Sequence, residues 1–212
     1  MTKAERTRQF IVESVAPIFN KKGAYGTSLS DITEATGLTK GAIYGNFKDK
    51  DNLAVACFEH NLKFFQKGLF KALTTTDNSW SKLERFFTFY EEGFEQVYEN
   101  GGCALMNSSV EADDGYPLLK ERVSVTFTNW KKELAAVITE GQMSGEFKAE
   151  VHASEMANLI IAGIEGSILI AKSTQNKNSF GTTLNYLKSI IEKQLKMDLK
   201  CLKQKFLRKK PC

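Results

Sequence analysis

The sequence predicts an all-α protein in which a small N-terminal helical domain precedes a larger helical one. The 212-residue chain contains only three prolines, and 42% of its residues are hydrophobic, which is enough for a sizeable core. Apolar residues recur at the spacing of amphipathic helices over most of the chain. We expect three parts, which are residues 1–50, residues 51–200, and a basic, poorly ordered tail at residues 201–212.

The cysteines, the histidines and the N-terminus favour a protein of the cytoplasm. Four cysteines lie far apart without CxxC spacing and only two histidines are present, so we expect reduced thiols, no metal site and no cofactor. No apolar run reaches the ~18–20 residues of a transmembrane helix. The polar N-terminus of mixed charge does not resemble a signal peptide. We therefore expect no contact with a membrane.

The first expected helix covers residues 3–22. Phe10, Ile11, Val15, Ile18 and Phe19 recur at helical spacing and form one apolar stripe. A kink is expected at the proline at position 17, because proline in a helix loses a hydrogen bond and clashes with the preceding turn. The glycine at position 23 is expected to end this helix.

Two short helices follow. Ser28 to Asp31 fit a capping box that starts a helix ending near residue 36. Gly37 allows a tight turn, and Thr39 is a suitable N-cap for a second helix over residues 40–46. Two helices of about seven residues joined by a glycine turn have the layout of a helix-turn-helix, here at about residues 27–46. Asp49 then caps a long helix from residue 50 to beyond residue 70.

The second short helix is expected to expose side chains suited to DNA. Small residues let the backbone approach closely, a lysine supplies charge, and polar tips supply hydrogen bonds. The exposed set is Thr39, Lys40, Gly41, Ala42, Tyr44 and Asn46. Residues 1–50 carry eight Lys/Arg against five Asp/Glu, which also favours a polyanionic partner. Residues 179–212 carry nine Lys/Arg against two Asp/Glu, and we interpret this positive charge as that of a solvated helix followed by a tail.

The rest of the chain is expected to form long helices. The expected ranges are residues 79–99, 103–112, 117–143, 152–173 and 180–200. Ile160, Ile164 and Ile168 form a stripe on a helix that is apolar nearly all round, so it should be buried on more than one side. Gly163 would let another helix approach closely.

The helix-turn-helix region resembles the signature of the tetracycline-repressor (TetR) family. The resemblance begins with Gly23-Ala24-Tyr25 and Thr27 to Ile32, continues through Ala35 to Phe47, and closes with Lys48 to Leu53. It is dense over residues 8–60, and beyond them it depends on chain length and helix layout. The family usually has histidine at position 46, where this chain has asparagine.

The resemblance implies a homodimer that places two recognition helices in successive major grooves of a near-palindromic operator. Thr27, Thr39, Lys40, Tyr44 and Lys50 are then the expected phosphate contacts, and residues 40–42 would lie nearest the bases. Ser28 and Asn46 complete the expected DNA-binding set. The family also implies a dimer interface built from the last two helices, for which we expect Ile160, Gly163, Ile164, Ile168, Leu187 and Ile191. A purely intramolecular core is the alternative for these residues.

The family places an effector cavity among the middle helices, where this chain is rich in aromatic residues. The expected lining residues are Phe65, Phe86, Phe89, Tyr90, Cys103, Met106, Asn107, Phe127 and Trp130. A stripe of this kind is otherwise simply core. The implied ligand is small, largely apolar or aromatic, and carries a polar handle. Glu111 is a weaker hint of a cationic ligand and is more simply part of a solvated loop. Family habit favours a repressor over an activator.

Cys103 offers an alternative mode of sensing. It stands at an expected helix N-terminus, which lowers the pKa of a thiol, and Lys172 is a candidate cationic neighbour. An electrophile- or redox-sensing repressor is therefore the second hypothesis, although an inert pocket residue is the simpler interpretation. A Cys103–His152 pair is the best case for an enzyme, and no motif supports it, so we expect no enzyme. The long helix from residue 50 is expected to couple the sensor to the DNA-reading helix.

Overall fold

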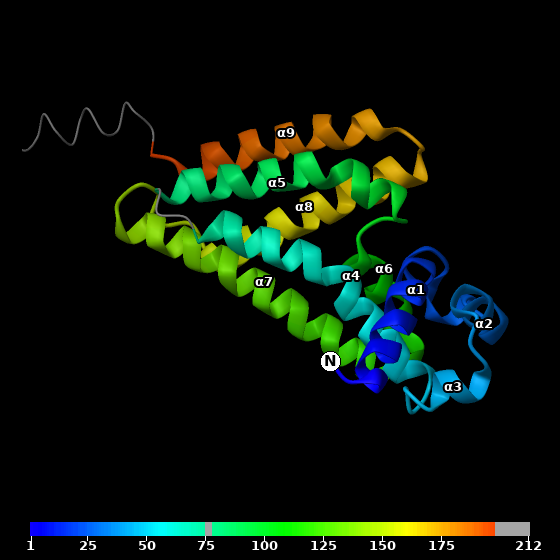
Figure 1. Cartoon of the computed structure of the whole chain (residues 1–212). Helices are drawn as coiled ribbons and strands as arrows, with labels where there is room; N and C mark the ends of the chain where they lie inside the picture. Colours follow the sequence, from blue (N-terminus) through cyan, green and yellow to red (C-terminus); the bar gives the residue numbers. More distant parts are fainter. Residues whose placement is uncertain (75–77, 198–212) are drawn as a thin grey trace, which may run out of the picture.

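A computed structural model describes residues 1–74 and 78–197, and these residues are almost entirely helical. The helices are α1 (Lys3–Gly26), α2 (Leu29–Thr36), α3 (Lys40–Tyr44), α4 (Lys50–Leu73), α5 (Ser79–Glu99), α6 (Ala104–Gly115), α7 (Pro117–Met143), α8 (Ala153–Ser173) and α9 (Lys177–Leu195). Helices α1 to α3 form one end of the molecule, and α5, α8 and α9 form the other (Figure 1). The predicted all-α fold is confirmed over these residues.

Local sequence signals start the three helices around the helix-turn-helix as predicted. The Ser28 hydroxyl accepts a hydrogen bond from the Asp31 backbone N–H, while the Asp31 carboxylate accepts one from the backbone of Ser28. Thr39 caps α3 by accepting from the backbone of Ala42, and Asp49 caps α4 in the same way. These side chains satisfy N–H groups that a helix start leaves without partners.

Several helix boundaries differ from the prediction. The expected end of the first helix at Gly23 is confirmed, since Gly23 has the non-helical angles φ 77° and ψ 161° and breaks α1 there, whereas Pro17 stands inside the helix. The chain then makes one further turn up to Gly26. Helix α3 ends at Tyr44, α6 extends to Gly115, and α9 covers residues 177–195. The tail predicted at residues 201–212 lies outside the described residues.

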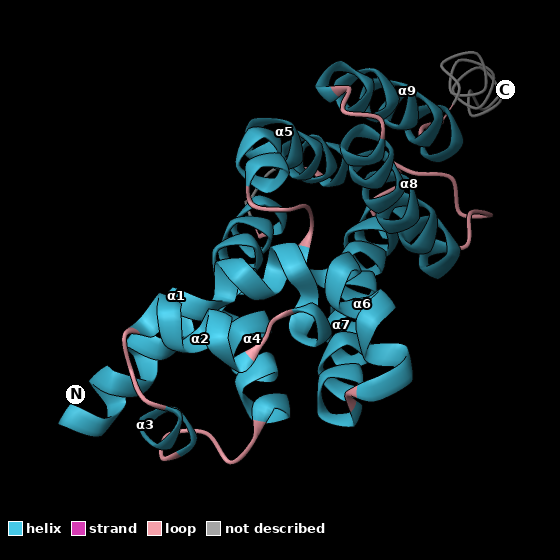
Figure 2. Ribbon diagram, turned by 90° about the vertical axis from the view of Figure 1, so that its right-hand side faces the viewer, coloured by secondary structure: helices cyan, strands magenta, loops and turns pink. Residues whose placement is uncertain are grey.

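Helix α4 connects the two ends of the molecule. It packs against α1 beside the helix-turn-helix and against α5, α6 and α7 of the body (Figures 1 and 2). Ile11, Ile32, Ile43, Phe47 and Leu53 are buried where α1 to α4 meet. Because this core includes the first turn of α4, the orientation of the helix-turn-helix depends on the position of α4.

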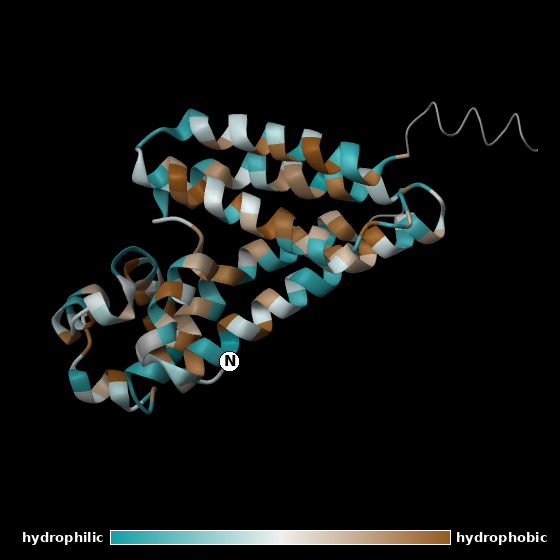
Figure 3. Cartoon of the chain, turned by 180° about the vertical axis from the view of Figure 1, so that it is seen from behind, coloured by the Kyte–Doolittle hydropathy of each residue, from teal (hydrophilic) through white to brown (hydrophobic). Residues whose placement is uncertain are grey.

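Among the described helices that are long enough to span a membrane, α8 is the most apolar. It is long and apolar enough by composition alone to cross a bilayer, which the sequence prediction did not recognise. It packs against α7 and α9, and hydrophobic residues are concentrated along it in Figure 3. Ile160, Ile164 and Ala171 are buried in these contacts. The packing of α8 is that of a core helix of the bundle.

Candidate nucleic-acid interface and small-molecule cavity

The start of α3 is open on the surface of the helix-turn-helix. Thr39, Lys40 and Gly41 are exposed, and no atom lies within 4 Å of the point where a Cβ on Gly41 would stand. Ser28 is also exposed, whereas Ala42, Tyr44, Asn46 and Lys50 are partly buried. A backbone that is open at the start of a capped helix can approach a phosphate or a base edge closely.

Thr27 does not belong to this surface. Its side chain is fully buried, and its hydroxyl donates a hydrogen bond of 2.6 Å to the Gly23 carbonyl oxygen. Its backbone N–H donates to the same oxygen at 3.1 Å. The prediction of a phosphate contact from Thr27 is therefore wrong, because this residue closes the break in α1.

Ser28 is exposed, but its hydroxyl is already part of the α2 cap. It donates to Asp31 Oδ2 at 2.7 Å, and Lys22 forms an ion pair of 2.7 Å with the same carboxylate. The Lys22 and Ser28 contacts hold the pKa of Asp31 well below its usual range. Lys22 thereby joins the end of α1 to the start of α2.

Arg8 on α1 holds the end of the recognition helix, and the sequence prediction missed it. Its guanidinium donates to the Asn46 carbonyl oxygen at 2.8 Å and lies 4.0 Å from the centroid of the Phe47 ring. The Asn46 side chain donates to the Ala42 carbonyl oxygen at 2.8 Å, so its amide N–H faces its own helix. Nothing in the local pattern around Arg8 indicates a contact with residues so distant in sequence.

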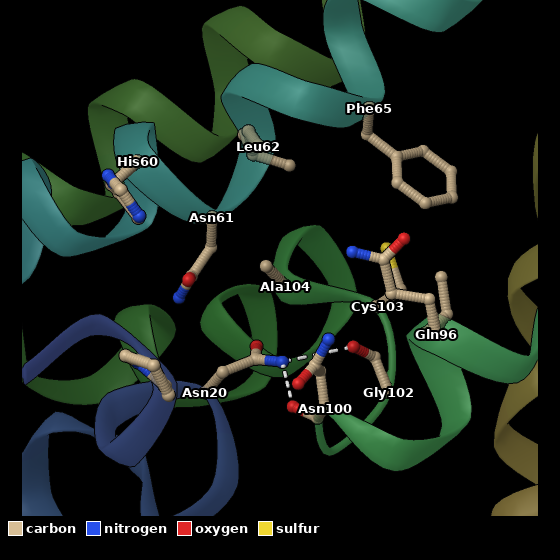
Figure 4. A pocket seen from close by; sticks show the side chains of 12 residues that line it. Asn20, His60, Asn61, Leu62, Phe65, Gln96, Asn100, Gly102, Cys103 and Ala104 are labelled. Carbon is tan, nitrogen blue, oxygen red and sulfur yellow. Dashed lines mark hydrogen bonds between the residues drawn. The ribbon is translucent and has the colours of Figure 1, made fainter. Parts of the chain in front are cut away.

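A cavity of about 250 Å³ lies where α1, α4, α5 and the start of α6 meet (Figure 4). Two of the predicted lining residues, Phe65 and Cys103, line it. The side chains that the prediction missed are mostly polar or small, and they are Pro17, Asn20, His60, Asn61, Leu62, Gln96, Val97, Asn100 and Ala104. The sequence could have indicated these residues through the asparagines that interrupt apolar helical stripes, because a buried amide there needs a hydrogen-bond partner.

The other predicted effector residues lie elsewhere. Phe86, Tyr90 and Trp130 are buried in the core, and Phe89, Met106 and Phe127 pack partly buried against it. Asn107 donates to the carbonyl oxygens of Asn20 and Gly101, both at about 3 Å, which ties α6 to α1. For most of these aromatic residues, the structure agrees with the simpler interpretation as core.

Cys103 has an acidic neighbour. Its thiol donates to Glu165 Oε1 at 3.2 Å, while the Lys172 ammonium donates to the Tyr98 carbonyl oxygen instead. Burial and the Glu165 carboxyl raise the pKa of the Cys103 thiol well above its usual range. The alternative of an activated Cys103 is therefore not favoured, because Lys172 bonds elsewhere and thiolate formation beside a buried acid is unfavourable.

Glu111 is a structural bridge and not part of the cavity. Its carboxylate accepts hydrogen bonds from the backbone N–H groups of Ala24, at 2.7 Å, and of Tyr25. The Tyr25 ring packs edge-on against the Tyr116 ring, with centroids 4.9 Å apart. These contacts fasten α6 of the body to the break in α1, beside the helix-turn-helix.

Most of the predicted dimer residues are buried within one chain. Ile160, Ile164, Ile168 and Ile191 are at most 1% exposed, and Leu187 packs where a Cβ on Gly163 would stand. The close approach at Gly163 therefore serves the packing of α9 on α8 in the same chain. A second face of these helices is open and carries Leu159, Ala162, Leu169, Ile170 and Tyr186. Direct contact with a partner through the four isoleucines is thus excluded in this fold.

The capped and exposed α3 and the separate helical body define a helix-turn-helix transcription regulator. Residues 11–57 match the family model for bacterial regulatory proteins of the tetR family, and residues 79–187 match the tetracyclin repressor-like, C-terminal domain. The chain belongs to the TetR family of transcription regulators, which bind DNA through this motif.

Two solved structures and a relative named as a repressor support this membership. A TetR-family regulator from Cytophaga hutchinsonii is 36% identical, with a TM-score of 0.85 over 93% of this chain and 98% of that chain. A TetR regulator from Chloroflexus aurantiacus is 31% identical, with a TM-score of 0.83 over 93% and 100%. The HTH-type transcriptional repressor DhaR from a Mycobacterium species is 26% identical over 80% of this chain and 84% of its own length.

Proposed function

We propose that this protein is a cytoplasmic, homodimeric repressor that binds a near-palindromic operator and is released by a small molecule. The observation that carries the proposal is the exposed, capped start of α3, with Thr39, Lys40 and Gly41 open to a ligand. DhaR, a relative over most of the chain, is a transcriptional repressor. Since the relatives are regulators, we assign no catalytic role.

The proposed DNA contacts follow from the surface around α3. Lys40 and Lys50 would neutralise phosphates, and residues 40–42 would lie nearest the base edges. Two such helices in a dimer would read half-sites about 34–36 Å apart, one turn of B-DNA. Asn46 is available through its side-chain oxygen, because its amide N–H is bonded within α3.

Operator binding over a series of salt concentrations tests this proposal. The operator is first selected from genomic fragments. Its affinity is then measured by fluorescence anisotropy between about 50 and 200 mM salt, the range over which phosphate contacts weaken strongly. Lys40→Ala should weaken binding and reduce the slope of log affinity against log salt by about 1. An affinity that does not change with salt, or a slope unchanged in Lys40→Ala, would contradict the proposal.

The proposed dimer uses the open face of α8 and α9. Leu159, Leu169 and Ile170 are about half exposed, Tyr186 is 69% exposed, and no atom lies within 4 Å of a Cβ placed on Gly166. Large exposed apolar residues at helical spacing mark an interaction surface. A small residue among them would let a partner helix approach closely.

The proposed effector site is the cavity lined by Phe65 and Cys103. It is small beside the roughly 300–1,000 Å³ of typical ligand pockets. Its walls combine an aromatic ring with four uncharged amide side chains, from Asn20, Asn61, Gln96 and Asn100. Such a lining suits a small molecule with an apolar body and a polar group.

A further inference from the structure

Glu165 on α8 is a buried carboxyl group with one oxygen unused. The residue is 5% exposed, and Oε2 has no hydrogen-bond partner among residues 1–74 and 78–197. The other oxygen, Oε1, accepts only the weak thiol donor of Cys103. Buried polar atoms in folded proteins nearly always have a partner, so a lone carboxyl oxygen needs an explanation.

Within the part of the chain that the structure describes, no positive charge interacts with Glu165. Desolvation raises the pKa of the Glu165 carboxyl to about 7. The titratable groups that interact with it are Cys103 and, from α5, Tyr90, and both are acids whose own pKa values are raised. The buried side chains of α7 and α9 are not ionisable. Lys172, on α8 itself, directs its ammonium to Tyr98.

Glu165 lies one side chain behind the cavity. Cys103 lines the cavity and is bonded to Glu165, which does not line it. Cys103 thus separates the carboxyl from the cavity, and a ligand reaches Glu165 only where the Cys103 side chain turns aside. Figure 4 shows Cys103 and Gln96 on the same side of the cavity, with the Phe65 ring nearby.

We propose that Glu165 is the polar anchor of the effector site and selects a small aromatic molecule that bears a basic nitrogen. The ammonium would bind Oε2, and the aromatic part would pack on Phe65. Charged hydrogen bonds in a dry site are stronger than neutral ones, so the carboxylate would prefer an ammonium to a hydroxyl group. This inference depends on the ligand response proposed above and adds the chemical class of the ligand.

Binding of an ammonium ion would be coupled to loss of a proton from Glu165. Because desolvation raises the pKa of the Glu165 carboxyl to about 7, some of the carboxyl groups are protonated at neutral pH. The amine is already protonated in solution, and it pairs only with the ionised carboxylate. Binding of the amine near neutral pH should therefore release protons to the solvent.

Calorimetry with phenethylamine and phenethyl alcohol tests the proposal on the full chain without DNA. The amine should bind roughly tenfold more tightly than the alcohol. Its binding enthalpy should depend on the ionisation enthalpy of the buffer, which reports the released proton. Glu165→Gln should abolish both the preference and the proton release, whereas Glu155→Gln, an exposed change on the same helix, should preserve them.

Equal binding of the two probes by the wild-type protein would overturn the proposal, whether or not Glu165→Gln folds. Unchanged amine binding by a folded Glu165→Gln would also overturn it. Operator binding by the same preparations is measured separately, so a failure of the proposed DNA function is distinguishable from a failure of the proposed ligand class.

Discussion

At the scale of single residues, the position of the DNA-reading helix depends on a contact from outside the motif. Arg8 satisfies the carbonyl oxygen of Asn46 just beyond the C-terminal end of α3 and stacks on Phe47. A cation at this end of a helix also interacts favourably with the helix dipole. Arg8 is thus a positioning residue for α3, whereas Lys40 is placed to touch DNA itself.

Arg8→Gln should weaken operator binding without changing its dependence on salt. The loss of one hydrogen bond and one ring contact should reduce affinity roughly fivefold. The slope of log affinity against log salt should stay at the wild-type value, because no phosphate contact is removed. Arg6→Gln is the matched control on an exposed neighbour of the same helix. A slope that falls as it does in Lys40→Ala would show that Arg8 contacts phosphate directly.

At the scale of helices, α8 and α9 each have one face that is buried within the chain and another face that is exposed. The face with Ile164 and Ile191 holds the two helices together within the chain. The opposite face carries Leu169, Ile170 and Tyr186, which are at least half exposed in the single chain. A glutamate should therefore have different effects on the two faces.

Leu169→Glu should produce a folded monomer. A charge without a partner in an apolar interface costs several kcal/mol. Because Leu169 is exposed in the single chain, the glutamate should weaken dimerisation and leave the stability of the protomer unchanged. Sedimentation should show a monomer at micromolar concentration, while circular dichroism should show unchanged helicity. Met143→Glu, at an apolar position that is 85% exposed on α7, should remain dimeric. A dimeric Leu169→Glu would show that the interface lies elsewhere.

At the scale of the whole molecule, α4 and α6 connect the helical body to the helix-turn-helix, and α1 itself lines the cavity. The sequence indicated α4 as the connector, and the structure adds α6, which also contacts α1. Helix α6 begins at the cavity, next to Cys103, and its Glu111 carboxylate holds the backbone of Ala24 and Tyr25. A shift of α6 would therefore move the end of α1 from which α2 and α3 continue.

Operator binding should change the accessibility of Cys103, and Glu111→Ala should weaken that effect. Linked sites influence each other by equal free energies, typically about 1–3 kcal/mol or 5–150-fold. Mass spectrometry measures the rate of Cys103 alkylation with and without operator. Because Cys103 lines the cavity, this rate reports how accessible the cavity is, and no ligand needs to be known. Glu121→Ala, an exposed change on α7, is the control. A rate that DNA does not alter in the wild-type protein would show that the two sites are not coupled.

Local signals in the sequence predicted much of the fold but only part of the candidate site. The caps at Ser28, Thr39 and Asp49 involve residues three positions apart, so the sequence alone indicates them. Cys103 and Phe65 were expected near the cavity, yet most of the aromatic residues are core. An aromatic stripe has the same spacing whether it faces a cavity or a neighbouring helix, so the pattern cannot distinguish the two cases.

The sequence by itself determined the helices, their caps, the helix-turn-helix and the family. Each of these depends on residues within a few positions of one another, where periodicity and capping act. Only the tertiary structure showed that Arg8 holds Asn46, that Glu165 lies behind Cys103, and that Glu111 holds Ala24. These hydrogen bonds join residues 38, 62 and 87 positions apart. Contacts at such separations depend on how whole helices pack, which no local pattern encodes.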